Sequence, residues 1–303
     1  MSLIGTKHTS HDVRFCARVG SKAILNTRPA GDIAYKVSPF HRATFSRTSP
    51  QPGLPVEQFH LETYMCTMCG RVIQASGPLR YAIVDGLDVR DSRLTNYPRR
   101  WNGAPSQEFL AIRQNHKTGE RSLGPLKWGL IPSWCTDPKG GRKPINAKSE
   151  TVDRLPTFRE AYPNRRCILP VDGFYEWQAT KQGKQPYAIA MKDRSPFGIA
   201  ALWENWKDPS IGDWVRTFVI LTTPSNELIA RIHDRMPAIL QPADYSRWLG
   251  TEPDPRDLLA PFPSDLMTMW PISKRVNSPD NDDERLLDAI SLPASIYAPL
   301  SGS

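Results

Sequence analysis

Short apolar runs, each bounded by Gly, Pro, Asn or Asp, dominate the chain after residue 68. Their β-branched and aromatic residues are typical of strands. Residues 109–114 and 121–130 flank the turn sequence His116-Lys117-Thr118-Gly119, which predicts a hairpin. The other predicted strands are residues 69–75, 166–170, 173–178, 186–191, 197–203, 217–222 and 267–271.

Helical patterns are few and short. They predict helices at residues 78–84, 151–162, 226–233 and 242–249, the third with Ser225 as its N-cap. Strands outnumber helices and do not alternate with them, so the expected fold class is α+β. We expect a largely antiparallel, barrel-like β core with peripheral helices. The sequence contains no internal repeat, nucleotide-binding glycine loop or coiled coil.

The first 68 residues differ in composition from the rest. They contain none of the nine tryptophans and four of the six histidines. The segment is rich in Arg, Ser, Thr and Pro, which predicts disorder or upstream sequence joined by a misplaced start codon. It also resembles a transit peptide faintly, but no amphipathic helix is evident. The expected organisation is an extension at 1–68, one domain at 69–290 and a tail at 291–303, with loose order after Ser278.

Charge and cysteine content further limit the classes of partner and the cellular compartment that the sequence predicts. The formal net charge is +8, and +4 remains when the first 68 residues are left out. This basicity permits nucleic-acid binding. The five cysteines have no disulfide-framework spacing, and no signal peptide or membrane span is present, which predicts a cytoplasmic protein. Cys66 and Cys69 form a C-x-x-C pair without a second pair, so we expect neither a metal nor another cofactor.

Cys69 follows Met68 and could become the first residue of a mature chain. It would then carry a thiol and an α-amine on adjacent carbons, and the amine titrates close to neutral pH. Such a residue captures aldehydes, because the amine forms an imine and the thiolate then closes a five-membered ring on the same carbon. The alternative is a buried, inert cysteine.

Two further residues are candidates for acid–base chemistry. Glu176 lies within an aromatic strand, GFYEW, and shares a face with Phe174. A carboxyl group beside aromatic surface is a good proton donor, although a strand glutamate paired with an arginine is equally consistent with the pattern. His233 lies at the predicted end of a helix, where an imidazolium is stabilised, but a lone histidine is more often structural.

A basic loop, residues 131–146, leads into Asn146, whose amide both donates and accepts hydrogen bonds. The loop and its flanks interleave cations with aromatic residues, as grooves for single-stranded nucleic acid do. This pattern is weak on its own, because Lys and Arg often lie near Trp. The candidate contacts are Trp134, Arg142, Lys143 and Lys148.

Six blocks occur in order along the chain: MCGR, WNGAPS, KWGLIPSW, PINAKSET, GFYEW and TTPSNELIARIHDRMP. Together they resemble the SRAP family, the SOS-response-associated peptidases or abasic-site processing proteins. The resemblance spans residues 69–249 and continues more weakly to 277. It implies a single SRAP domain, monomeric, that binds single-stranded DNA containing abasic sites and crosslinks to it through an N-terminal cysteine. DNA-damage (SOS) functions and lyase or self-processing protease activity are further implications.

The resemblance also assigns roles. Cys69 matches the crosslinking cysteine, and Asn146, Glu176 and His233 match the other catalytic positions. Arg71, Trp134 and Lys148 match positions that contact DNA; Lys148 replaces an arginine, which keeps the charge but loses bidentate phosphate contact.

Two alternatives remain open. One is a cysteine peptidase or amidohydrolase in which Cys69 attacks an acyl carbon, with His233 as base and Asn146 as orienter. The other is a DNA-binding module without a covalent step.

Overall fold

The computed structural model describes residues 70–84, 86–87, 94, 96–137 and 143–292. All of these lie in the second of the two units into which the chain divides, Thr67–Ser303. Cys69, Arg142 and the predicted extension at 1–68 fall outside the described residues.

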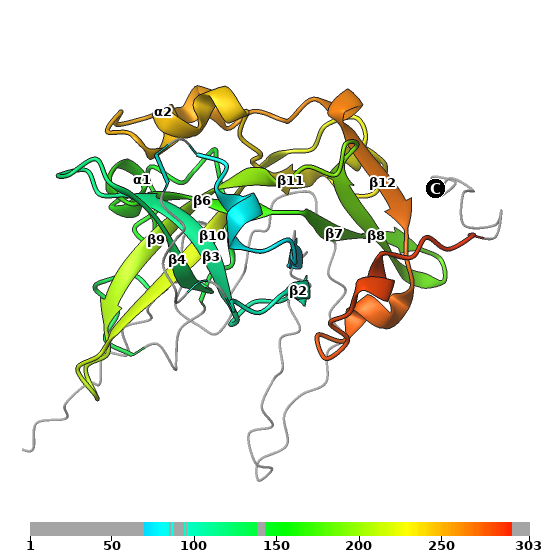
Figure 1. Ribbon diagram of the computed structural model, residues 1–303, viewed down its shortest axis with the longest axis horizontal. Coiled ribbons are helices and arrows are strands. Elements are labelled where there is room, and N and C mark those ends of the chain that lie inside the picture. Colours follow the sequence, from blue (N-terminus) through cyan, green and yellow to red (C-terminus); the bar gives the residue numbers. More distant parts are fainter. Residues whose placement is uncertain (1–69, 85, 88–93, 95, 138–142, 293–303) are drawn as a thin grey trace, which may run out of the picture. The chain divides into compact units, whose positions relative to one another are not determined.

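A closed five-stranded barrel forms the larger part of the fold (Figure 1). Strand β10 pairs with β4 on one edge and β9 on the other, and β3 and β6 complete the ring. Of the five pairings in this ring only β4–β10 is parallel, so the predicted α+β class with a largely antiparallel, barrel-like core is confirmed. The strands are β3 (Glu108–Gln114), β4 (Arg121–Trp128), β6 (Arg166–Val171), β9 (Phe197–Lys207) and β10 (Trp214–Pro224).

The strand directions define two ends of this barrel. Strands β4, β6 and β10 finish where β3 and β9 begin, and His233 follows β10 at this end, which we call the His233 end. At the other end β3 and β9 finish while β4, β6 and β10 begin. Arg113 lies there, and we call it the Arg113 end.

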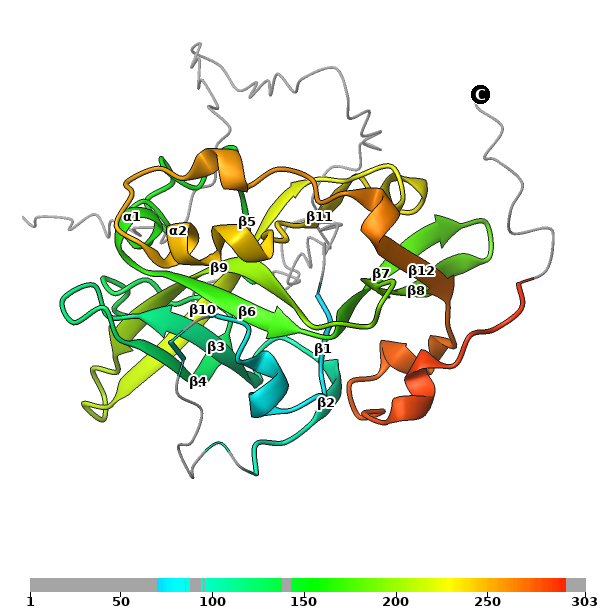
Figure 2. The ribbon, with the colours of Figure 1, turned by 45° about the horizontal axis from the view of Figure 1, so that its top comes forward.

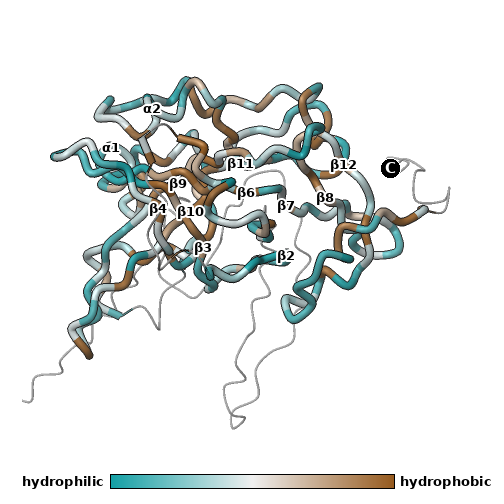
Figure 3. The backbone as a smooth tube through the Cα atoms, viewed as in Figure 1, coloured by the Kyte–Doolittle hydropathy of each residue, from teal (hydrophilic) through white to brown (hydrophobic). Residues whose placement is uncertain are grey.

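Side chains alternate between the two faces of each strand, so the apolar side chains of the barrel form two layers. One face contributes Phe109, Leu126, Cys167, Ala201 and Phe218 to a single cluster, so all five strands meet inside the barrel. The opposite face packs against loops and short helices. Figure 3 shows hydrophobic backbone concentrated in these strands.

A second, antiparallel sheet extends from the His233 end, with the order β12-β8-β7-β1-β2 (Figure 2). Its inner face continues the barrel cluster through Val72, Phe174 and Ile189. Gly173 is required here, because a Cβ atom would lie 2.6 Å from the carbonyl oxygen of Ile189. The strands are β12 (Met267–Pro271), β8 (Gly183–Met191), β7 (Gly173–Thr180), β1 (Val72–Gln74) and β2 (Arg100–Gly103).

The helices are short, and they cover the outer face of the barrel and the edge of the second sheet. Buried Arg166 on β6 anchors the end of α2, because it donates hydrogen bonds to the carbonyl oxygens of Trp248, Gly250 and Glu252. None of the helices in the described ranges is long and apolar enough to cross a bilayer. They are α1 (Ala161–Asn164), α2 (Tyr245–Leu249) and the 3-10 turns η1 (Pro78–Tyr81), η3 (Ile229–Arg231), η4 (Pro242–Asp244), η5 (Arg256–Leu258), η6 (Ser264–Leu266), η7 (Lys274–Asn277) and η8 (Glu284–Leu287).

Two sequence predictions about helices were wrong. The helix at 226–233 is only the single turn η3, and its N-cap is Leu228 rather than Ser225. The side-chain oxygen of Asn226 accepts a hydrogen bond from the Ile229 N–H at 3.0 Å. The chain must then turn back to form β11, which leaves no room for a longer helix. The predicted helix at 151–162 consists of turns, because Pro156 interrupts it before α1 begins at Ala161.

The segment after Ser278 is also better ordered than predicted. Asp282 accepts hydrogen bonds from the backbone of Trp101 and Asn102, at 2.5 and 2.8 Å. The Asn102 amide in turn donates to the carbonyl oxygens of Val276, Ser278 and Asn281. These contacts fix the C-terminal segment to β2.

Candidate active site

Glu176 projects from β7 toward the apolar interior. Its residue surface is 2% exposed, and it shares a face with buried Phe174, whereas Tyr175 and Trp177 pack on the opposite face. The alternation predicted from GFYEW is therefore confirmed. Burial of a carboxyl group is costly unless polar groups face it. Its environment must therefore supply them.

His233 is one such group. Its Nε2 lies 4.0 Å from Glu176 Oε1, and both side chains are almost fully buried. The backbone N–H of Arg235 lies 3.1 Å from His233 Nδ1, which fixes the orientation of the ring. Asp234 Oδ1 also lies 3.1 Å from Nδ1. An imidazolium would therefore have a carboxylate beside each nitrogen.

The end of β10 gathers the segments that carry the other candidates. On one edge, β5 (Asn146–Lys148) runs parallel to β10, with Asn146 opposite Ile220 and Lys148 opposite Thr222. On the other edge, β11 (Arg235–Pro237) pairs with Thr222 to Pro224. Figure 2 shows β5 and β11 at this end of the barrel. Asn146 is partly buried, and Lys148 is exposed.

An ion pair between buried Arg235 and exposed Glu150 links the segments of β5 and β11. Arg235, 9% exposed, donates to both carboxylate oxygens of Glu150 and to the carbonyl oxygen of Thr222 at 2.7 Å. The hydrogen bonds from Arg235 lower the pKa of Glu150. Arg235 lies two residues after His233, and Glu150 lies two residues after Lys148. The pair therefore fixes the histidine segment relative to β5.

Arg71 is held against the outer face of β7. Its guanidinium lies 5.9 Å from the Trp177 ring and donates to the carbonyl oxygen of Asn277 at 3.2 Å. Trp177 Nε1 donates to the side-chain oxygen of the same asparagine at 2.8 Å. Burial lowers the pKa of Arg71. Its Nε is buried without a hydrogen-bond partner in the described part of the chain.

The register of β1 relates the start of the described chain to Glu176. Val72 pairs with Phe174 in an antiparallel ladder, and the Tyr175 N–H donates to the carbonyl oxygen of Arg71. The same register, continued by two pairs from Val72–Phe174, sets Gly70 opposite Glu176. The sequence places Cys69 directly before Gly70.

The remaining candidates lie apart from this cluster. Trp134, 49% exposed, lies in the loop between β4 and β5. Its neighbour Cys135 accepts a hydrogen bond from Trp206 Nε1 at 2.6 Å, which places this loop near the Arg113 end. Lys143 is exposed. Cys69 and Arg142 lie outside the described residues, so their predicted roles stay predictions.

Two residues that secure β1 were missed by the sequence analysis. Gln74, 3% exposed, exchanges hydrogen bonds with the backbone of Leu110 and donates to the carbonyl oxygen of Pro170. Asp172 accepts from the N–H groups of Ala75 and Ser76 and from the Tyr81 hydroxyl. The signal for Gln74 was an isolated amide within an apolar strand. Both residues make the strand that follows Gly70 a rigid support.

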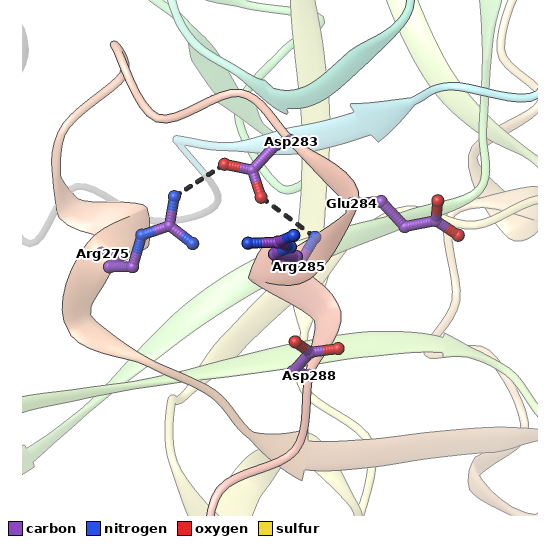
Figure 4. Close-up of a pocket in the computed structure, with 5 residues that line it drawn as sticks. All are labelled: Arg275, Asp283, Glu284, Arg285 and Asp288. Atoms are coloured by element: carbon purple, nitrogen blue, oxygen red, sulfur yellow. Dashed lines mark hydrogen bonds and ion pairs between the residues drawn. The ribbon is translucent and has the colours of Figure 1, made fainter.

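A hollow of about 670 Å³ near the C-terminal segment is a poor alternative site (Figure 4). Its lining is charged, and Asp283 is already engaged by Arg275 at 2.7 Å and by the Arg285 N–H. Within the described ranges, no group of three His, Cys, Asp or Glu residues could hold a metal ion. The His233–Glu176 cluster is therefore the best candidate for chemistry.

These features define a class: a β-barrel protein with a buried carboxyl–imidazole pair beside the strand that opens its domain. The SOS response associated peptidase (SRAP) family profile matches residues 68–279. The chain accordingly belongs to the SRAP family.

Relatives and solved structures agree with this assignment. Abasic site processing protein YoaM of Bacillus subtilis is 42% identical over 228 residues, which cover 73% of this chain and 98% of YoaM. Abasic site processing protein HMCES of Xenopus tropicalis is 30% identical over 244 residues, 71% of this chain and 73% of that protein. A crystal structure of a Bacteroides thetaiotaomicron protein superposes with a TM-score of 0.65 at 25% identity, covering 74% of this chain and all of that one.

Proposed function

We propose that this protein processes abasic sites in single-stranded DNA by forming a covalent thiazolidine crosslink through Cys69. The observation that carries the proposal is the buried Glu176–His233 pair, 4.0 Å apart, with Glu176 on the strand whose register faces Gly70. The names of its relatives support abasic DNA as the substrate. Arg71 and Lys148 supply cations for the DNA backbone.

The chemistry requires one proton donor. The Cys69 amine adds to the C1′ aldehyde of the ring-opened sugar to give a carbinolamine. Glu176 protonates the carbinolamine hydroxyl, water departs, and the carboxylate recovers a proton from the nitrogen as the imine forms. The thiol sulfur then bonds to the same carbon while its proton passes to the nitrogen, which closes the ring.

The other residues position the reactants. Asn146 orients the amine through its amide group. His233 holds the ring-opened hydroxyl or the 3′ phosphate. An imine at C1′ acidifies the neighbouring carbon, so β-elimination is a natural side reaction of the same intermediate.

The mechanism needs a free α-amine, so the active chain begins at Cys69. Two proteins test this requirement: one translated from Met68, and the 303-residue chain with Met68→Ala, each checked by mass at its N-terminus. The first should lose methionine and crosslink, whereas chains retaining residues before Cys69 should bind DNA without crosslinking.

Denaturing electrophoresis after incubation with single-stranded DNA containing one abasic site tests the crosslink itself. The shifted band should disappear when borohydride first reduces the aldehyde to an alcohol. A band that persists on reduced DNA, or that forms with a chain whose α-amine is acetylated, contradicts the mechanism. The second result favours the cysteine-peptidase alternative, which needs only the thiol. A complex that dissociates fully in hot detergent favours the non-covalent alternative.

A further inference from the structure

The Arg113 end of the barrel presents two cations that face the same space. Arg113 follows Phe109 and Ala111 on the inner face of β3, and Arg216 precedes Phe218 on the inner face of β10. Burial and the positive charge of Arg216 both lower the pKa of Arg113. Two guanidinium groups in this arrangement repel each other.

Arg113 has no anionic partner in the described part of the protein. Its guanidinium makes no hydrogen bond or ion pair there, and its Nε is buried. It lies 5.1 Å from the Trp203 ring, which fixes its orientation. The carboxylate of Glu204 is on the opposite face of β9 and pairs with Arg165 at 2.7 Å. An uncompensated, half-buried cation is expensive for a fold, which indicates that an anion completes this site.

A third polar group borders the two arginines. Asn205 pairs directly across the strands with Arg216, and its Oδ1 is buried without a hydrogen-bond partner among the described residues. Rotation of the amide would direct its NH₂ group, a donor, to the same place. Two guanidinium groups and one amide form a donor set that suits the oxygen atoms of a phosphate.

The loop carrying Trp134 connects this end to the proposed DNA path. Lys148 lies level with Thr222, at the His233 end of β10. The loop then reaches Trp206, which pairs with Val215, one residue from Arg216. Arg216 and Thr222 are six positions apart along the strand, a span of about 20 Å. Trp134 and the two arginines therefore lie at the same end of the barrel, and a strand of DNA that contacts both Lys148 and Trp134 runs from the His233 end to the Arg113 end.

We propose that Arg113, Trp203, Asn205 and Arg216 form a second phosphate-binding site, at the end of the barrel remote from Glu176, that holds the backbone of the bound DNA strand. This inference rests on the proposed function, because the proposed function supplies the ligand, single-stranded DNA. It adds a contact that the crosslinking reaction does not use, and it makes affinity depend on DNA length.

The test is the equilibrium binding of unmodified single-stranded DNA to the 303-residue chain, measured by fluorescence anisotropy over a range of salt concentrations. Arg113→Gln, Arg216→Gln and the double variant are compared with Arg159→Gln/Lys192→Gln, which removes the same charge from exposed positions. For a strand of about twenty nucleotides, the double variant should lose about 1.4 from the salt slope and about 25-fold in affinity at 0.1 M salt. A strand of about four nucleotides, too short to span both ends, should bind all variants alike.

Several results would overturn the inference. One is equal affinity and salt slope for the double variant and the control on the long strand, with wild-type binding intact; the proposed function then stands without the second site. Another concerns inorganic phosphate as the ligand. If phosphate raises the melting temperature of the wild type but not of the double variant, and both proteins bind DNA equally well, the site binds a free anion and not DNA. Failure of the wild-type chain to bind DNA removes the proposed function and this ligand together.

Melting temperatures separate binding from folding. Because Arg113 has no partner and is repelled by Arg216, Arg113→Gln should melt no lower than the wild type without DNA. If Arg113 proves necessary for folding, the exposed Arg216 still tests the site through Arg216→Gln alone.

Discussion

The two ends of the barrel differ in how their charged side chains are paired. At the His233 end, Arg235 is paired with the carboxylate of Glu150 and donates to the carbonyl oxygen of Thr222, and Glu176 faces an imidazole. At the Arg113 end, two guanidinium groups share a space without a carboxylate from the described residues. Paired charges fix geometry, whereas unpaired charges retain the capacity to bind. Under the two proposals, one end performs the chemistry and the other holds the DNA.

Glu176→Gln should have the largest effect, because it removes the titrating proton while preserving the shape of the side chain. We expect the crosslinking rate to fall about 10²–10⁴-fold with little change in DNA affinity. Single-turnover crosslinking and anisotropy on reduced abasic DNA measure the two quantities separately. Equal losses in both would mean that Glu176 serves only to maintain the fold.

Gly173→Ala should destabilise the support of that site. The new Cβ would lie 2.6 Å from the Ile189 carbonyl oxygen and 3.1 Å from Ile73 Cδ1, in a region where three strands pack closely. We expect about 1–3 kcal/mol of lost unfolding free energy in urea. Gly70→Ala is the control, since its Cβ would be 3.9 Å from the nearest atom, Ile145 Cδ1. Similar losses for both would show that steric crowding at Gly173 is not the cause.

Lys148→Ala should affect binding and leave the chemistry intact. Loss of one phosphate contact reduces the salt slope by about 0.7 and the affinity by about 5-fold at 0.1 M salt. At saturating DNA, the crosslinking rate should match that of the wild type. A slower rate at saturation would instead place Lys148 in the reaction.

The smallest effect concerns the Arg235–Glu150 pair. Because Arg235 lowers the pKa of Glu150, the ionised pair stabilises the folded state above the ordinary carboxyl value of 4.5, and this contribution is lost as pH falls through the lower folded value. Glu150→Gln should therefore be less stable than wild type at pH 7, and the difference should shrink below about pH 4.5. Glu150 is partly exposed, so the gap is modest. A gap that is independent of pH would contradict the charge assignment.

The sequence predicted the strands well because their apolar content is local information. Residues 267–271 form β12 over the predicted range, and the hairpin of β3 and β4 surrounds the predicted turn. Helix 226–233 failed because tertiary pairing of β11 with β10 overrides local propensity. The loop-rich segments around the barrel have no hydrophobic periodicity from which their structure could have been predicted.

For the candidate site, too, the sequence predicted individual residues but not the contacts between distant segments. Glu176 and His233 were selected from their motifs, but their contact joins positions 57 residues apart, which no spacing rule provides. Arg235 was part of a motif, yet its pairing with Glu150 depends on how β5 and β11 flank β10. Arg113 was not selected from the sequence, because only closure of the barrel brings it near Arg216.

The pairing pattern of β10 also bears on how the chain is synthesised. This strand joins β4, β5, β9 and β11, and it closes the ring only after residue 224 has been made. Until it emerges from the ribosome, β4 and β9 present unpaired edges, and the apolar faces of Leu126 and Ala201 lack their covering strand. Such edges are prone to aggregation. A ribosome stalled just before β10 should therefore leave a nascent chain that chaperones hold, whereas one stalled beyond β11 should already carry a protease-resistant barrel.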